Sequence, residues 1–78
     1  MFLEIITPDK KLFSGEVKSI KLPGVDGSFG VLKNHAPIIS SLKKGVVKIT
    51  DEKQGVQNFD IKGGVVEVLK NKVIVLAE

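Results

Sequence analysis

Residue types that could do chemistry are few in this sequence of 78 residues, which has one histidine, His35, and no cysteine. Nucleophilic catalysis needs a nucleophile beside a base, and transition-metal sites need several histidine or cysteine ligands. The aspartates that could supply a carboxylate site are scattered along the chain, at Asp9, Asp26, Asp51 and Asp60. Walker A, GxGxxG, GxSxG and EF-hand patterns do not occur. The sequence therefore predicts no metal, no cofactor and no enzymatic activity of the chain by itself.

The glycine-rich segment from Pro23 to Pro37, PGVDGSFGVLKNHAP, carries three glycines at three-residue spacing, Gly24, Gly27 and Gly30. Phosphate-binding glycine loops gain much of their attraction from the helix N-terminus that follows them, whereas a strand is expected here. We therefore interpret the glycines as serving turns and close approach of the backbone. Because a proline stiffens each end, the segment is predicted to be a shaped loop.

Two side chains of this segment each allow two interpretations. His35 fits a capping or half-buried turn residue, and it also fits a direct contact to a partner. Phe29 fits a core residue, and it also fits an apolar tip presented outward. The sequence alone leaves both pairs of alternatives open.

The whole chain consists of short apolar runs separated by turn residues, which is typical of an all-β sandwich or barrel. Strands are expected at Phe2 to Thr7, Phe13 to Leu22, Gly27 to Leu32, Ile38 to Leu42, Gly45 to Thr50, Val56 to Lys62, Val65 to Leu69 and Val73 to Ala77. The second of these strands is expected to be broken at Ser14-Gly15, and a slip in its apolar phase between Val17 and Ile20 indicates a bulge. Gly63-Gly64 predicts a tight corner. The last strand, VIVLA, is apolar at every position, so we expect it to lie centrally with both faces covered.

Composition limits the domain organisation and the partners. With 42% hydrophobic residues, the chain is expected to form a single domain over residues 1–78. The apolar start is short and interrupted by Glu4, so no targeting or membrane-spanning segment is expected. The net charge is +3 and the lysines form no block of like charge, which favours protection of strand edges over nucleic-acid binding.

A small β-barrel module that binds single-stranded nucleic acid is the alternative function. It draws on the run GSFGVL, which is superficially similar to a cold-shock motif. The four phenylalanines, without tyrosine or tryptophan, leave few platforms on which bases could stack.

Three long stretches match a known family in register: LEIITPDKKLFSGEVKSIKLPGVDGSFGVL, NHAPIISSLKKGVVKI and IKGGVVEVLKNKVIVLAE. They resemble the epsilon subunit of the F-type ATP synthase, called delta in mitochondria. The resemblance implies an all-β fold, a β-sandwich or flattened barrel of two roughly five-stranded sheets. It also implies a non-catalytic subunit of the central stalk that binds the gamma subunit and the c-ring and couples proton or sodium flow to ATP synthesis. The alpha/beta hexamer would be an indirect partner, and the membrane, the bacterial inner membrane on its cytoplasmic side, would be reached only through the complex.

The resemblance also assigns contacts. Residues that correspond to the family's ring-contacting loop are Val25, Asp26, Gly27, Ser28, Phe29 and Gly30, and those that correspond to the gamma-facing region are His35, Ala36 and Pro37. Some relatives carry an acid where Ser28 stands, so Asp26 is the carboxylate that this loop offers instead. Many relatives continue into a helical hairpin that restrains ATP hydrolysis. This sequence ends at Glu78, so a short form without hairpin inhibition or ATP binding is expected.

Overall fold

The computed structural model describes residues 1–78 and consists of nine β-strands with turns and loops between them. The strands are β1 (Phe2–Ile6), β2 (Lys11–Glu16), β3 (Ser19–Gly24), β4 (Gly27–Leu32), β5 (Ile38–Leu42), β6 (Gly45–Thr50), β7 (Val56–Ile61), β8 (Gly64–Leu69) and β9 (Lys72–Ala77). The predicted all-β class is confirmed. The chain has no helix of the length and apolar character needed to cross a membrane.

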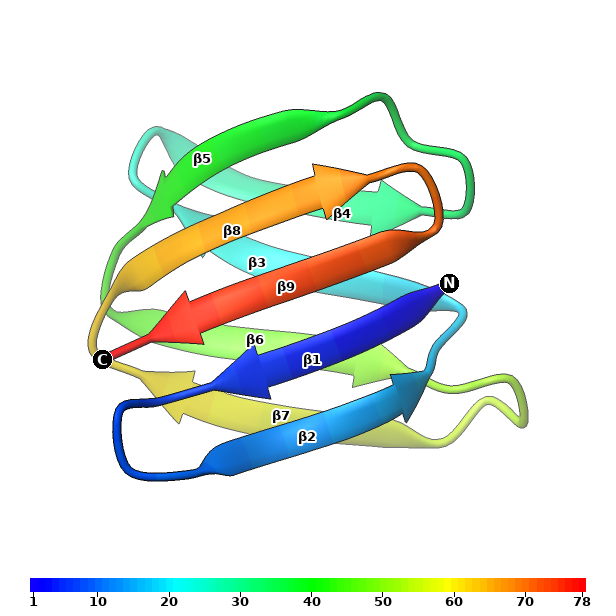
Figure 1. Cartoon of the computed structure of the whole chain (residues 1–78), viewed down its shortest axis with the longest axis horizontal. Helices are drawn as coiled ribbons and strands as arrows, with labels where there is room; N and C mark the ends of the chain where they lie inside the picture. The colour runs from blue at the N-terminus through cyan, green and yellow to red at the C-terminus, as the bar shows by residue number, and fades with distance from the viewer.

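The strands form two packed layers (Figure 1). Five strands, in the order β2-β1-β9-β8-β5, make the front layer, and four strands, β4-β3-β6-β7, make the back layer. The layers are joined where Gly24 of β3 pairs with Leu42 of β5, so the sheet is a flattened and nearly closed barrel. All pairs are antiparallel except β1 with β9, which run parallel.

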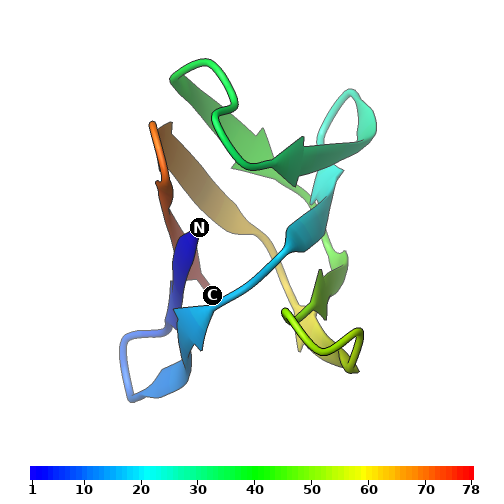
Figure 2. The same cartoon turned by 90° about the vertical axis from the view of Figure 1, so that its right-hand side faces the viewer.

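The predicted strand from Phe13 to Leu22 with a break at Ser14-Gly15 is wrong, because β2 runs unbroken through these two residues and the chain changes layer after it, at Val17 and Lys18. The amide of Val17 donates to the carbonyl of Met1 in the front layer at 2.8 Å, and the amide of Lys18 donates to the carbonyl of Thr50 in the back layer at 2.7 Å. Figure 2 shows this segment crossing from one layer to the other. The slip in the apolar pattern therefore reflects this change of layer and not the predicted bulge. The β1–β2 ladder does contain one register irregularity, which lies between Ile5 and Ile6.

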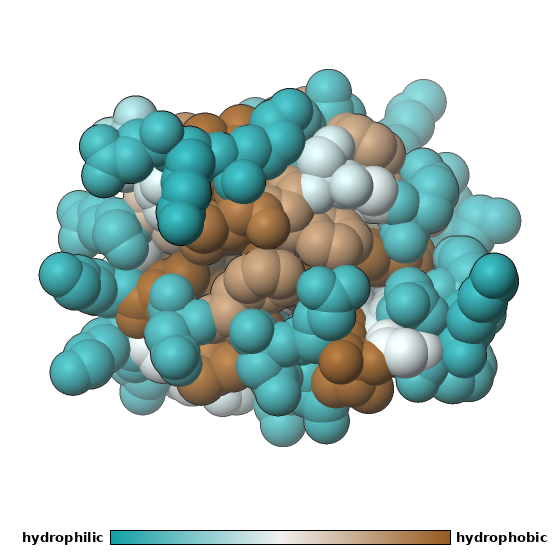
Figure 3. Space-filling view, turned by 90° about the horizontal axis from the view of Figure 1, so that it is seen from below, coloured by the Kyte–Doolittle hydropathy of each residue, from teal (hydrophilic) through white to brown (hydrophobic).

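The core between the layers is entirely apolar. Sixteen buried hydrophobic residues form one cluster, and no polar or charged residue is buried with them. The two layers also meet at the edge strands β2 and β7, where the rings of Phe13 and Phe59 pack edge to face with centroids 5.9 Å apart. Seen from below, apolar side chains show along this side within a polar rim (Figure 3). Aromatic packing therefore holds together an edge that no backbone ladder closes.

The predicted corner at Gly63-Gly64 is confirmed. Both residues have positive φ, 148° at Gly63 and 149° at Gly64, a conformation that L side chains rarely adopt. A Cβ atom at Gly64 would also collide with the carbonyl oxygen of Leu76. Glycine is therefore required at the start of β8 by both conformation and space.

Strand β9 lies in the middle of the front layer, between β1 and β8, as predicted. The expectation that both of its faces are covered is wrong. Val73, Val75 and Ala77 are buried on the inner face, whereas Leu76 on the outer face is 55% exposed. No element of this chain packs on the outside of the front layer.

Candidate interaction surfaces

The segment predicted to contact the ring forms the tip of the β3–β4 hairpin and the first part of β4. Gly24 and Gly27 are a cross-strand pair, so Val25 and Asp26 are the two central residues of the turn. Neither of them has positive φ; Gly27, which follows the turn, takes it instead, at 129°. The structure thus confirms the interpretation that Gly27 serves a turn.

Backbone hydrogen bonds hold the tip to the end of β5. The amide of Val25 donates to the carbonyl of Ser41 at 3.1 Å, and the amide of Lys43 donates to the carbonyl of Pro23 at 2.9 Å. The side chains of Val25 and Asp26 remain exposed, Val25 at 51%. The tip is therefore a fixed projection that offers one apolar side chain and one carboxylate to a partner.

Phe29 takes the core position of its two predicted alternatives. It is half-buried, packs against the hydrophobic cluster and lies over Gly24, where an added Cβ would come within 2.9 Å of the ring and within 2.7 Å of the carbonyl oxygen of Gly27. Gly24 is thus a position of close approach, as the sequence suggested. Phe29 supports the tip from below, while Val25, Asp26 and Ser28 are its exposed side chains.

The predicted gamma-facing residues form the loop between β4 and β5. His35 is a half-buried turn residue whose amide donates to the carbonyl of Leu32 at 3.2 Å. Its ring Nδ1 lies 2.7 Å from the carbonyl oxygen of Ala36, which fixes the ring against the loop. Ala36 and Pro37 are exposed. The imidazole therefore has a structural role in the loop, and its neighbours supply the exposed surface.

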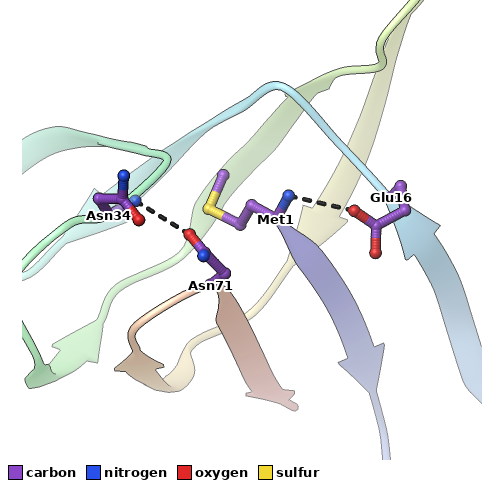
Figure 4. Close-up of polar contacts among 4 residues, drawn as sticks. All are labelled: Met1, Glu16, Asn34 and Asn71. Atoms are coloured by element: carbon purple, nitrogen blue, oxygen red, sulfur yellow. Dashed lines mark hydrogen bonds and ion pairs between the residues drawn. The ribbon is translucent and has the colours of Figure 1, made fainter.

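A second contact ties this loop to the turn between β8 and β9. Asn34, which has a positive φ of 64°, donates its backbone amide to the side-chain carbonyl of Asn71 at 3.1 Å. Figure 4 shows this pair beside the N-terminal strand, where the amino group of Met1 lies 3.1 Å from a carboxylate oxygen of Glu16. The β4–β5 loop is thus attached to the front layer although it leaves from the back layer.

The hairpin tip of the predicted ring contact and the predicted gamma-facing loop lie at opposite ends of β4. The hairpin tip precedes this six-residue strand and the His35 loop follows it, so they are separated by about 20 Å at 3.3 Å per residue. Figure 1 shows the tip and the loop on opposite sides of the molecule. One partner at each segment could bind without touching the other.

An apolar surface on the outside of the front layer is missing from the sequence prediction. Register aligns outward-facing side chains of β5, β8, β9 and β1 in rows. The large exposed apolar residues among them, here called the outer apolar face, are Ile39 at 73%, Leu76 at 55%, Leu69 at 49% and Val65 at 39%. The apolar residues at the outer positions of VIVLA were the sequence feature from which this face could have been predicted. We interpreted them as covered by another part of the chain, and no part of this chain covers them.

This outer apolar face continues into the His35 loop. A hollow of about 330 Å³ is lined by Pro37, Ile38, Ile39, Glu67, Val68 and Leu69. Contiguous exposed apolar surface on a small protein marks a place where another molecule binds. The hollow therefore joins Pro37 of the loop to Ile39 and Leu69 of the outer apolar face, with the carboxylate of Glu67 among its lining residues.

The ionisable side chains of the molecule are dispersed over its surface. No group of three histidine, cysteine, aspartate or glutamate side chains is placed to hold a metal ion. The only ion pairs join the Met1 amino group to Glu16 and Lys11 to Glu4. The distinctive features of the molecule are surfaces that could receive other proteins.

Comparison with known proteins agrees with this description. A family model described as "ATP synthase, Delta/Epsilon chain, beta-sandwich domain" matches residues 1–78. The ATP synthase epsilon chain of Chlorobium limicola is 46% identical over 76 residues, which cover 97% of this chain and 86% of that protein. The epsilon chain of Caulobacter vibrioides is 40% identical over 78 residues, covering 100% of this chain and 90% of that protein.

Solved structures support the fold. The Euglena gracilis mitochondrial ATP synthase structure, described as OSCP/F1/c-ring, contains a chain that matches with a TM-score of 0.90 at 23% identity, over 96% of this chain and 48% of that one. A central stalk/c-ring structure from Tetrahymena thermophila matches with a TM-score of 0.82 at 20% identity, over 99% of this chain and 62% of that one. The family model and the curated relatives together show that this chain belongs to the ATP synthase delta/epsilon family, as a β-sandwich domain of that family.

Proposed function

We propose that this chain, acting as one domain over residues 1–78, is the rotor subunit that joins gamma to the c-ring in an F-type ATP synthase. Its relatives are epsilon chains of that enzyme, which makes it a non-catalytic subunit of the complex rather than a nucleic-acid-binding module. The observation that carries the proposal is the placement of two exposed contact segments at opposite ends of one strand in a densely packed sandwich.

The hairpin tip is the proposed ring contact, over Val25 to Gly30. Asp26 offers an exposed carboxylate to a basic side chain, and Val25 offers apolar surface beside it. The backbone bonds from the tip to Ser41 and Lys43 keep both groups in place. A fixed tip loses little conformational entropy on binding, and this favours affinity.

The β4–β5 loop, His35 to Pro37, is the proposed gamma contact, and we extend it over the outer apolar face. Ile39 and Leu69 are exposed beside the hollow that Pro37 helps to line. Burial of apolar surface contributes about 25 cal/mol per Å². A partner that covers this face would thus gain binding energy from the apolar area it buries, reduced by the entropic cost of association, and the loop would set its orientation.

Stiffness suits such a joint. The core is apolar throughout, and the layers are connected at the β3–β5 pair and at the Phe13–Phe59 contact. Close-packed interiors have low compressibility. A torque applied between the tip and the outer apolar face would therefore be transmitted with little deformation of the domain.

The ATP synthase complex is membrane-bound, and we infer that this chain lies on the cytoplasmic side of a bacterial inner membrane. The similar epsilon chains described above come from bacteria. The chain would be attached to the membrane only through gamma and the ring.

Binding measurements with the two purified partners separately test the proposal. Asp26→Lys should weaken binding to the detergent-solubilised ring by roughly tenfold and leave binding to gamma unchanged, because a rim charge is reversed at one surface only. Ile39→Asp should do the opposite, since it places a carboxylate in an apolar contact.

Two control variants make equivalent changes of charge at positions outside both proposed contact surfaces. Glu52→Lys makes the same charge change as Asp26→Lys in the exposed β6–β7 loop, and Val56→Asp places a carboxylate on exposed β7. Both controls should bind both partners normally. Failure of the unmodified chain to bind either partner would contradict the proposed function, and loss of both partners in each variant would contradict the division into two surfaces.

A further inference from the structure

The outer face of the back layer contains a hollow of about 380 Å³ that crosses β4, β3 and β6. Lys21 of β3 and Lys48 of β6 stand in it side by side, with Ser19 and Thr50 in the next row. Gly30 of β4 lies in the same row as the two lysines, and Leu32 stands at the end of β4, 63% exposed. These residues are called the lysine hollow below.

The two lysines are an unfavourable pair within the isolated chain. Lys21 and Lys48 are direct cross-strand partners, and like charges directly opposite each other destabilise a sheet. Neither takes part in either of the ion pairs of the molecule. On this face the only other charged strand residue is Asp60, which is displaced by one row and lies opposite Val46. The face therefore carries a net positive charge, because one carboxylate in the next row stands against two lysines.

Gly30 is not required by the conformation of the chain. Its φ is not positive, and an added Cβ would meet only the carbonyl oxygen of Ile20, at an ordinary 3.7 Å. Glycine within a strand is destabilising by roughly 0.5–1 kcal/mol relative to alanine. A glycine within a strand that neither backbone conformation nor packing requires often marks a place where another molecule approaches the backbone. Here the missing side chain opens a path from the free edge of β4 to Lys21.

We propose that the lysine hollow is a docking site for an acidic, extended segment of a partner protein. A carboxylate of that segment lies between the ammonium groups of Lys21 and Lys48 and relieves their repulsion. An apolar side chain two residues along, which faces the same side of the sheet, covers Leu32, and the segment runs beside β4, whose outer edge has no strand partner. Main-chain pairing along a free edge provides affinity, and the lysines provide specificity.

The chemistry of the hollow favours an acidic peptide over other anions. Phe29 is its only aromatic residue, and that ring packs against the core and Gly24, so no stacking platform is presented to a nucleic acid. A small anion would meet two exposed lysines but would leave Leu32 and the β4 edge unused. Lys21 and Lys48, which carry the proposal, belong to neither the ring contact nor the gamma contact, although Ser28, Phe29 and Gly30 line the hollow and are also part of the proposed ring contact.

Nuclear magnetic resonance titration of the full chain tests this site. The probe is a short blocked peptide in which glutamate and valine stand two residues apart with threonine between them, so that both face the same side when the peptide is extended, and the matched probe has glutamine in place of glutamate. The acidic peptide should cause saturable shifts at the amides of Ser19–Lys21, Ser28–Leu32 and Lys48–Thr50. Binding should weaken as salt rises from about 50 to about 500 mM, because exposed charges are screened. The glutamine peptide should bind at least about tenfold more weakly, a difference of about 1.4 kcal/mol.

Variants locate the site. Lys21→Gln with Lys48→Gln should weaken the acidic peptide by roughly tenfold, whereas Lys53→Gln with Lys70→Gln, the same charge change in exposed turns, should leave it unchanged. Gly30→Val should keep the chain folded, with an unfolding temperature at least as high as that of the unmodified chain, and should block the peptide. Asp26→Lys, which tests the ring contact, should leave peptide binding intact.

Several outcomes would overturn the proposal. They are an absence of saturable shifts, equal loss with both lysine pairs, unchanged binding to the Gly30→Val variant, and tighter binding of inorganic phosphate or a single-stranded oligonucleotide at the same amides. The last result would assign the hollow to a small anion or to nucleic acid instead.

Discussion

The backbone amide of Asn34 donates to the side-chain carbonyl of Asn71 at 3.1 Å, so the β8–β9 turn holds the β4–β5 loop. The two residues are 37 positions apart in the sequence. This bond fixes the direction in which His35, Ala36 and Pro37 leave the sandwich. It therefore connects the stability of a turn in the front layer with the proposed gamma contact.

Removal of the acceptor should loosen the loop. Asn71→Ala deletes one exposed hydrogen bond, which contributes about 0.5–1.5 kcal/mol. Amide hydrogen exchange at Asn34 should become roughly 2 to 10 times faster, and affinity for gamma should fall. Asn58→Ala is the matched control, because Asn58 is exposed on β7. Unchanged exchange at Asn34 would contradict this role of Asn71.

Gly24 and Gly30 should respond oppositely to the same substitution. Gly24→Ala places a Cβ within 3 Å of Phe29 and of the Gly27 carbonyl oxygen, and such overpacking is destabilising by about 1–3 kcal/mol. Gly30→Ala fits without a clash and should stabilise the strand by about 0.5–1 kcal/mol. Urea unfolding of both variants measures the difference. Equal effects of the two substitutions would rule out the packing of Phe29 on Gly24 described above.

Val75 and Leu76 are neighbours with different roles. Val75 is fully buried, so Val75→Ala should lower the free energy of unfolding by about 1.5–3 kcal/mol, a large share of the roughly 5 kcal/mol of a small domain. Leu76 is more than half exposed on the outer apolar face, so Leu76→Ala should change stability by less than about 1 kcal/mol. Its effect should appear in gamma binding. Calorimetry combined with a gamma-binding assay separates the two roles.

The corner at Gly64 should tolerate no side chain. Gly64→Ala forces a Cβ onto the carbonyl of Leu76 at a φ of 149°, and both the clash and the conformation oppose it. We expect loss of the folded state by circular dichroism. Gly15→Ala is the control, because its Cβ would meet only Phe13 at an ordinary 3.6 Å. A folded and stable Gly64→Ala chain would contradict this geometry.

The cross-strand lysines offer a stability measurement that needs no ligand. Lys21→Glu replaces a like-charge pair with an opposite-charge pair beside Lys48 and should raise stability by about 0.2–1 kcal/mol at low salt. The gain should shrink as salt is added. Lys18→Glu, in the exposed crossing between β2 and β3, should not show this gain. A salt-independent change at Lys21 would point to packing rather than charge.

Local sequence signals predicted much of the strand layout. The bounds of β4, β5 and β6 agree with the expectations, because Gly27, Pro37 and Gly45 mark their starts by turn chemistry. The paired glycines at the start of β8 were found for the same reason. These features depend on the conformational preferences of a few adjacent residues, which sequence alone contains.

The features that the sequence did not predict depend on distant partners. The slip between Val17 and Ile20 fits a bulge as well as a change of layer, and only the bonds to Met1 and Thr50 distinguish them. The apolar outer positions of β9 fit burial within the chain as well as burial by another protein. For the candidate site, the sequence located the tip and the loop, whereas their placement at opposite ends of β4 and the row that joins Gly30 to the lysines depend on sheet register. The assigned ring and gamma contacts remain predictions.

The parallel pairing of β1 with β9 has a consequence for how the chain acquires its structure during synthesis. Strand β1 cannot join the rest of the front layer until β9 has been synthesised, because β9 lies between β1 and β8. Until then the β1–β2 hairpin has no neighbour in its own layer, and its apolar inner side lacks a cover. Pairing between strands so far apart in the sequence slows folding, and the intermediates expose hydrophobic surface that makes them prone to aggregate. A nascent chain that stalls before β9 should therefore be a substrate for chaperones rather than a stable fragment.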